Sequence, residues 1–152
     1  MKTNTLNKRV LLLLAGLVLL TAVLAALHLT TRTAVPKGTL LVEAQGETME
    51  AALPELTLSP VRGTVVNGKG EETAIHRQGL LLSELLAHCG VTDFRQVTVT
   101  ADDAYSAAVT REEILAPDKV YLVMEEDAVQ MVVFGDPNSK RRVSGVVSLC
   151  VA

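Results

Sequence analysis

Twenty consecutive residues, Val10 to Leu29, read VLLLLAGLVLLTAVLAALHL and contain no Asp, Glu, Lys or Arg. A helix of that length spans about 30 Å, the thickness of the hydrocarbon core of a bilayer. Basic residues tend to remain on the cytoplasmic side, and this run is preceded by Lys2, Lys8 and Arg9. The pattern predicts a cytoplasmic tail over residues 1–9 and a single transmembrane signal anchor over residues 10–29.

A cleaved signal peptide is the alternative interpretation of the same run, since Val23 and Ala25 are small residues of the kind that precede a cleavage site. The run is longer than an ordinary signal-peptide core, which favours the uncleaved anchor. A polar linker follows over residues 30–38. We therefore expect a single-pass protein of a bacterial-type cell membrane, with its C-terminal domain extracytoplasmic.

Beyond the linker, short apolar or alternating runs are separated by turn residues, a pattern typical of strands. Two stretches have helical signals instead: Leu82, Leu85 and Leu86 share one helical face, and Thr110 with Glu113 has the form of a capping box. The predicted strands are Thr39–Ala44, Thr48–Ala52, Ser59–Val66, Thr73–His76, Gln96–Thr100, Tyr105–Val109, Val120–Met124, Gln130–Phe134 and Val143–Val151.

Many short strands with two brief helices between them predict an α+β domain over residues 39–152, with mixed β-sheets and short helices. In the predicted architecture this domain follows one N-terminal transmembrane helix. Asn67-Gly68 is the strongest hairpin signal in the chain, because both residues accept the positive φ angles of a tight type I′ turn.

Charge divides the chain sharply. Four of the 14 Lys and Arg residues lie in the first 32 positions, which leaves 10 basic against 17 acidic residues and a net charge of −7 beyond them. An acidic domain is repelled by phosphate backbones, so nucleic-acid binding is excluded as a function class. The one basic cluster, Lys140-Arg141-Arg142, is short and is interpreted as a solvated turn.

The residues offer no convincing catalytic constellation and no metal-ligand spacing, so we expect no catalytic residues and no metal site. Cys89 and Cys150 do not form a CxxC motif. Either a disulfide between them or two buried free thiols fits the sequence. Tyr105, beside the acidic pair Asp102-Asp103, is either an amphipathic residue at the edge of the core or the lip of a ligand pocket.

The order of these segments resembles the sulfite-oxidase-type molybdopterin-binding domain of oxidoreductases, over about residues 39 to 152. The resemblance lies in a helix opened by a glycine, in a strand followed by a "D-G-Y"-like turn, in a short helix and in a closing hairpin. The corresponding segments are Gln78–Leu86 with Cys89–Val91, Val97–Ser106, Val109–Ile114, Met131–Gly135 and Arg142–Val147.

The departures from this family affect the expected activity. In catalytic members a cysteine in the strand before the helix supplies a thiolate to molybdenum, whereas the comparable stretch here, Leu56–Gly63, has no cysteine. Since a soft metal needs that sulfur, the resemblance implies the fold rather than the activity. On the former cofactor face, we expect hydrogen-bonding groups around a shallow cleft from Arg62, Asp103, Tyr105 and Arg142.

Three functions follow as expectations. The first is a non-catalytic domain, without a resident cofactor, that binds a small ligand or an envelope protein. The second is a genuine molybdopterin-binding redox component, which would be a molybdopterin-dependent oxidoreductase. The third is an assembly module in which the edge of a sheet pairs with a partner, and Gln96–Thr100 is the strand predicted to form that edge.

Overall fold

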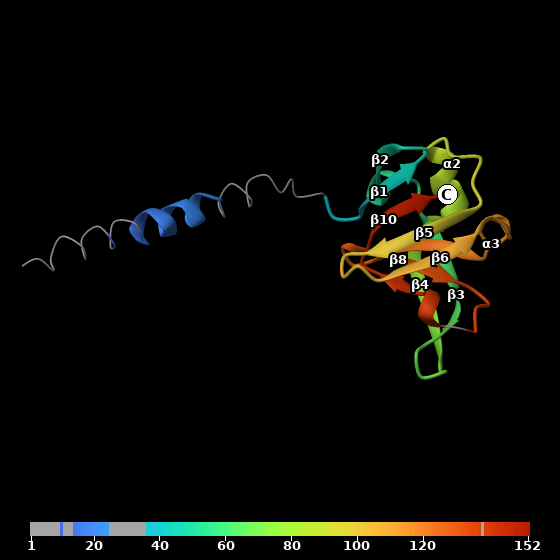
Figure 1. The fold of residues 1–152 in the computed structure, drawn as a ribbon. Helices are drawn as coiled ribbons and strands as arrows, with labels where there is room; N and C mark the ends of the chain where they lie inside the picture. The colour runs from blue at the N-terminus through green and yellow to red at the C-terminus, as the bar shows by residue number, and fades with distance from the viewer. Residues whose placement is uncertain (1–9, 11–13, 25–35, 138) are drawn as a thin grey trace, which may run out of the picture. The chain divides into compact units, whose positions relative to one another are not determined.

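The computed structural model describes residues 10, 14–24, 36–137 and 139–152. The chain divides into two units, Met1–Val35 and Pro36–Ala152, each of which is described by itself. The first unit contains a helix over residues 14–24 (Figure 1). The predicted tail, residues 1–9, and residues 30–35 of the predicted linker lie outside the described residues.

The predicted transmembrane helix requires correction. Residues 11–13 and 25–29 of the expected span lie outside the described residues, and within the rest of it Val10 and residues 14–24 are helical. Within the part of the chain that is described, no helix has the length and apolar character needed to span a membrane. The predictions of a transmembrane anchor and of a single-pass membrane location are therefore wrong.

The second unit is an α+β domain built on two five-stranded sheets (Figure 1). Sheet A has the order β2-β1-β10-β5-β6, in which β1 and β10 are parallel and the other neighbours antiparallel. Its strands are β1 (Thr39–Ala44), β2 (Glu47–Ala52), β5 (Gln96–Ala101), β6 (Ser106–Thr110) and β10 (Val146–Val151).

Sheet B is antiparallel, with the order β3-β4-β7-β8-β9. Its strands are β3 (Ser59–Val66), β4 (Glu72–Leu81), β7 (Val120–Glu125), β8 (Ala128–Val133) and β9 (Val143–Ser144). The helical elements of the domain are η1 (Leu53–Glu55), α2 (Leu82–His88), α3 (Arg111–Leu115) and η2 (Ser139–Arg141).

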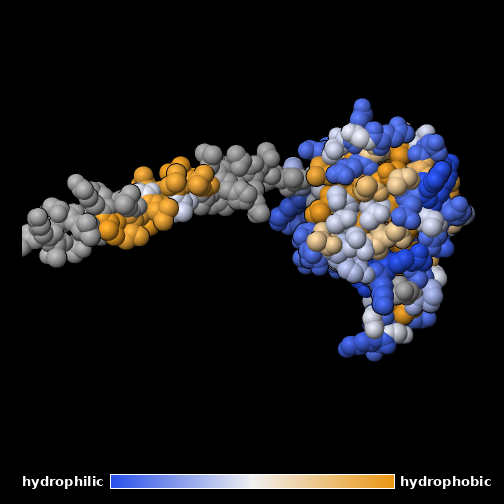
Figure 2. All heavy atoms as spheres, viewed as in Figure 1, coloured by the Kyte–Doolittle hydropathy of each residue, from blue (hydrophilic) through white to orange (hydrophobic). Residues whose placement is uncertain are grey.

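The main hydrophobic core lies between the two sheets and beneath α2. Sheet A contributes Val42, Val99 and Leu149, and sheet B contributes Leu122 and Met131, all with no exposed surface. These residues alternate along their strands with residues on the outer faces, which is the period of a half-buried strand. Figure 2 shows hydrophilic residues over much of the visible surface of the domain, with paler and apolar patches between them.

A second, smaller cluster covers the outer face of sheet B, which is the face turned away from the main core. It consists of Val61, Val65, Ile75, Val123 and Val132, with Tyr121 and Phe134 packed against it. The hairpin of β3 and β4 supplies three of these residues, and β4 pairs with β7 through Gly79, Leu80 and Leu81.

Two glycines explain where the observed elements depart from the predicted ones. A Cβ at Gly79 would lie 2.4 Å from the main-chain oxygen of Leu122, so glycine lets β4 run on through the close pairing with β7. The predicted strand Val143–Val151 is divided at Gly145, whose φ of 68° is in the left-handed region. The chain passes there from sheet B to sheet A, a step that glycine makes without strain.

The strand predicted to be a pairing edge is an interior strand. Gln96–Ala101 forms β5, which pairs with β10 on one side and with β6 on the other. Its main-chain donors and acceptors are therefore used within sheet A, and Gln96–Thr100 cannot add a partner strand. The described edges are β2 and β6 in sheet A and β3 and β9 in sheet B.

Candidate functional site

A network of polar side chains lies on the outer face of sheet B, centred on Gln130 of β8. Gln130 is 1% exposed. Its Nε2 donates to Ser144 Oγ at 2.6 Å and to Glu125 Oε2 at 3.1 Å, and its Oε1 accepts from Arg142 Nη2 at 3.3 Å. Buried polar groups require such partners. We call Arg77, Glu125, Gln130, Arg142 and Ser144 the Gln130 network.

Strand alternation explains why these residues meet. Gln130 is in register with Val123 of β7 and with Ser144 of β9, and neighbouring residues such as Met131 point to the main core instead. Glu125 lies two positions beyond Val123, on the same face. Its second oxygen, Oε1, accepts from Arg77 Nη2 of β4 at 2.6 Å, so the network extends across β4, β7, β8 and β9.

Arg142 is the arginine of the network that has no carboxylate partner among the described residues. It is half-buried, and its one hydrogen bond between described residues is to the neutral amide of Gln130. A guanidinium has five N–H donors. Among the described residues no carboxylate pairs with Arg142, whereas Arg77 is paired with Glu125 and Arg141 with Glu113 and Asp136.

Asp103 and Tyr105 lie in the turn between β5 and β6. Asp103 Oδ1 accepts from the main-chain N–H of Tyr105 at 2.9 Å, and Ala104 between them has a φ of 67°. That left-handed angle is one that glycine adopts more easily, and the "D-G-Y" pattern has glycine at this place. The Tyr105 hydroxyl donates to the main-chain oxygen of Lys140 in η2, so the turn is joined to the segment that leads into Arg142.

A second charged cluster holds η2 against α3, and the sequence did not reveal it. Arg141 Nη1 donates to Glu113 Oε1 at 2.6 Å, and Arg141 Nε donates to Asp136. Partial burial raises the pKa of the Glu113 carboxyl, but hydrogen bonds from Arg141 and the Thr110 N–H, with the charges of Arg141 and Lys119, outweigh it and leave the pKa below its ordinary value. Lys140-Arg141-Arg142 is therefore more than a solvated turn.

Arg62 is the predicted ligand residue that lies apart from the other three. It is exposed on β3, and its Nε donates to His76 Nε2 on β4 at 3.0 Å. Arg62 alternates with Val61 and points to the other side of the hairpin from the second cluster. No hydrogen bond or ion pair between described residues joins Arg62 to Asp103, Tyr105 or Arg142.

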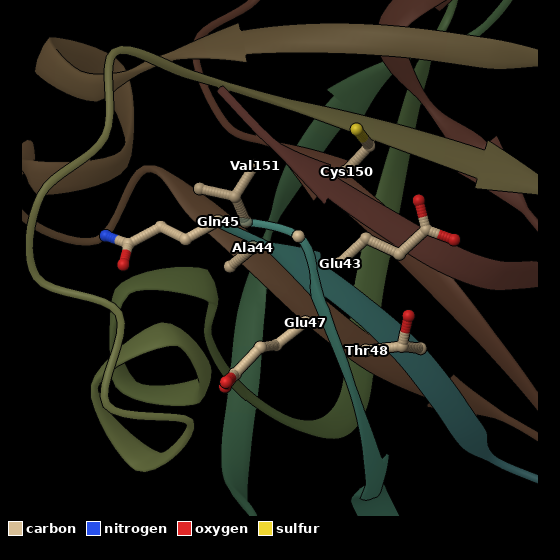
Figure 3. A pocket seen from close by; sticks show the side chains of 8 residues that line it. Glu43, Ala44, Gln45, Glu47, Thr48, Cys150 and Val151 are labelled. Carbon is tan, nitrogen blue, oxygen red and sulfur yellow. The ribbon is translucent and has the colours of Figure 1, made fainter.

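Both cysteines are free thiols, so they form no disulfide. Cys89 is half-buried at the end of α2, and burial raises the pKa of its thiol. Cys150 is exposed on the outer face of sheet A, and Figure 3 shows its sulfur on the same side of the strands as the side chains of Glu43 and Thr48. These three residues, with others of the β1–β2 turn, line a shallow open hollow.

The positions of the thiols bear on the possible cofactor. Leu149, next to Cys150, faces the core between the sheets, so Cys150 points away from sheet B and the Gln130 network. Cys89 packs against the main core at α2. The described residues contain no group of three His, Cys, Asp or Glu side chains placed to hold a metal ion. The arrangement does not fit a thiolate-bound molybdenum beside Arg142.

Comparison with known proteins gives no further assignment. Neither the scan against protein-family profiles nor the search of curated proteins finds a match to this chain. The similarity to the sulfite-oxidase-type molybdopterin-binding domain accordingly stays a prediction from the sequence.

Proposed function

We propose that the domain is a non-catalytic binding module that takes a small anionic ligand at Arg142. The observation that carries this proposal is the half-buried Arg142 guanidinium, held by a neutral amide and not neutralised by any carboxylate of the described residues. A guanidinium with free donors and reduced hydration is the preferred protein group for a carboxylate, sulfate or phosphate.

The surroundings of Arg142 support a site that is already formed before the ligand binds. Gln130 fixes the orientation of the Arg142 guanidinium, because the Gln130 amide is itself oriented by Glu125 and Ser144. The Tyr105 hydroxyl holds the main chain at Lys140, two residues before Arg142. A donor whose orientation is fixed in advance loses less entropy when a ligand binds. Asp103 contributes by holding the turn of Tyr105.

A molybdopterin cofactor has less support at this position. The family resemblance implies that a thiolate would hold the metal, and the two thiols of this chain lie on α2 and on the outer face of sheet A. Elemental and pterin analysis of protein from a host that makes the molybdenum cofactor tests this alternative directly. About one molybdenum and one pterin per chain would contradict the proposed cofactor-free binding module.

The binding experiment uses inorganic phosphate as the probe. The melting temperature of the full chain is measured in sodium phosphate and in sodium chloride of equal ionic strength, and binding is measured by titration calorimetry. A ligand that binds the native state raises the melting temperature. We expect phosphate to raise it for the natural chain and to have no specific effect on Arg142→Gln, since a charge-assisted hydrogen bond is worth about 1.5–3 kcal/mol, or roughly 10- to 100-fold in affinity.

Arg62→Gln is the matched control. Arg62 is also an arginine that no carboxylate of the described residues pairs with, but it lies on β3 and outside the Gln130 network. We expect Arg62→Gln to bind phosphate as the natural chain does. Equal losses in both variants would reveal a general charge effect and contradict a site at Arg142, as would the absence of any phosphate effect on the natural chain.

A further inference from the structure

The four described sheet edges differ in how they are protected from pairing with another strand. β2 has Glu47 and Glu50, β3 has Pro60 and Arg62, and β9 is two residues long. Charges, proline and short length are the usual means by which proteins block such edges. β6, with the sequence SAAVT, has no charge and no proline.

The pattern of hydrogen bonds between β5 and β6 shows which main-chain groups of β6 face outward, away from the sheet. The main-chain oxygen of Tyr105 accepts from Ala101 N–H at 2.8 Å, and Arg111 N–H donates to the oxygen of Arg95 at 2.9 Å. In an antiparallel pair the residues that bond to the neighbouring strand alternate with those that do not. Ala107 and Val109 therefore also bond to β5, whereas the main-chain groups of Ser106, Ala108 and Thr110 point away from it. The outward residues Ser106, Ala108 and Thr110 are exposed.

Two of these outward residues have free main-chain groups. The N–H of Thr110 is already used, because it donates to Glu113 Oε2 at 3.2 Å in the capping box of α3. No hydrogen bond between described residues outside the regular β5–β6 pairing uses the main-chain N–H or C=O of Ser106 or Ala108. The open part of the edge is therefore centred on Ala108.

We propose that β6 pairs antiparallel with β6 of a second copy of this chain, about a two-fold axis at Ala108. In this register Ala108 lies opposite its counterpart and Ser106 lies opposite Thr110 of the second copy, so only small uncharged side chains meet. A two-fold interface requires such self-complementarity. The two copies of sheet A then form one continuous sheet.

The charged side chains that follow β6 in α3 have partners within their own chain. Arg111 donates to Asp93 Oδ1 at 3.3 Å and to the main-chain oxygen of Phe94 at 3.1 Å, and Glu113 is paired with Arg141. The open part of the β6 edge is therefore left to the uncharged side chains of the strand itself.

Amide hydrogen exchange of the full chain tests the interface where it is proposed. β2 is the internal control, because Thr48 and Glu50 also have outward main-chain groups on an edge of the same sheet. We expect the Ser106 and Ala108 amides to exchange at least about tenfold more slowly than those of Thr48 and Glu50, since a paired amide exchanges only on opening. Equal rates would overturn the proposal, even if the chain associated through another surface.

Substitution gives the second test, with mass measured by light scattering during size exclusion. The natural chain is expected at twice its 16.2 kDa mass at micromolar concentration, and Ala108→Pro at the mass of one chain, because proline removes an outward N–H without breaking a bond to β5. Thr48→Pro makes the matched change on β2 and should leave the dimer intact. Ala108→Lys adds a charge to the edge and keeps every main-chain N–H, so it does not disturb the β5–β6 pairing. A folded, monomeric Ala108→Lys variant would show that the dimer is lost through loss of pairing and not through misfolding. A natural chain that is monomeric throughout, or dimeric Ala108 variants, would overturn the proposal.

Discussion

The outer faces of the two sheets are built from different kinds of polar residue. On sheet A the outward positions of β5 and β10 are small groups such as Thr98, Thr100, Ser148 and Cys150, and no hydrogen bond between described residues joins one of these side chains to another. On sheet B, Arg77, Glu125, Gln130 and Arg142 are linked in a continuous chain of hydrogen bonds.

This difference separates two meanings of a polar residue on a strand. A polar side chain that meets only water fits the ordinary alternation of a half-solvated sheet. A polar side chain that is buried and fixed by several partners costs free energy to leave unsatisfied, so its position is strongly determined. For this reason we place the candidate site on sheet B, and regard the hollow beside Cys150 on sheet A as a solvated surface.

The largest effect that tests the comparison is expected from Gln130→Leu. The substitution removes the shared partner of Glu125, Ser144 and Arg142. Glu125 and Arg142 are half-buried, and an unsatisfied buried group costs about 1–3 kcal/mol. We expect a loss of about 3 kcal/mol in the free energy of unfolding, measured by urea denaturation. Thr98→Val on the outer face of sheet A is the control and should change stability by less than about 0.5 kcal/mol. Equal effects would remove the distinction between the two faces.

The thiols give a second, smaller difference. Cys150 is exposed on sheet A, whereas Cys89 is half-buried and has a raised pKa, so less of it is thiolate at neutral pH. Because the thiolate is the nucleophile, we expect iodoacetamide to modify Cys150 at least about tenfold faster than Cys89 at pH 7.5. Mass spectrometry of tryptic peptides over time measures both rates. Faster reaction at Cys89 would contradict the described burial.

The smallest effect concerns Tyr121, which packs against the second cluster on sheet B. Burial, and then the hydrogen bond to Asp118, raise the pKa of Tyr121 from 10.0 to about 12. Between these values the unfolded phenol ionises while the folded one stays neutral, so stability falls as pH rises through this window and is unaffected by this group below it. Tyr121→Phe should lose less stability than the natural chain between pH 10 and 12.

Asp118→Asn sharpens that test, because it keeps the phenol and removes the carboxylate whose Oδ1 accepts a hydrogen bond from the Tyr121 hydroxyl at 2.7 Å. Its alkaline loss should lie between those of the natural chain and Tyr121→Phe. Denaturation at a series of pH values gives the three slopes. Identical slopes would show that Tyr121 does not contribute to the alkaline loss of stability.

Local patterns in the sequence predicted local structure well. Thr39–Ala44 and Ser59–Val66 have the predicted bounds, and the capping box of Thr110 and Glu113 forms as predicted. Each of these depends on residues close in sequence, for which alternation or side-chain chemistry is sufficient. The apolar run was the exception: its length predicted a membrane span over residues 10–29, whereas no helix among the described residues is long and apolar enough to be one.

The candidate site was less accessible to prediction, because its contacts join residues that are far apart. Arg142 and Tyr105 were predicted as ligand residues, but Gln130 was hidden in an apolar strand, QMVVF, and its partners come from β7 and β9. Arg141 and Glu113 are 28 residues apart. Which strands become neighbours decides such contacts, and one sequence does not specify strand order.

The central position of β10 has a consequence for the order in which the domain folds. β10 lies between β1 and β5, and its partner β1 was synthesised about a hundred residues earlier. Until β10 leaves the ribosome, the β1–β2 and β5–β6 hairpins are separate pieces of an incomplete sheet, whereas β3, β4, β7 and β8 are already available. Non-local strand pairing of this kind is slow, so we expect assembly of sheet A to limit the folding rate.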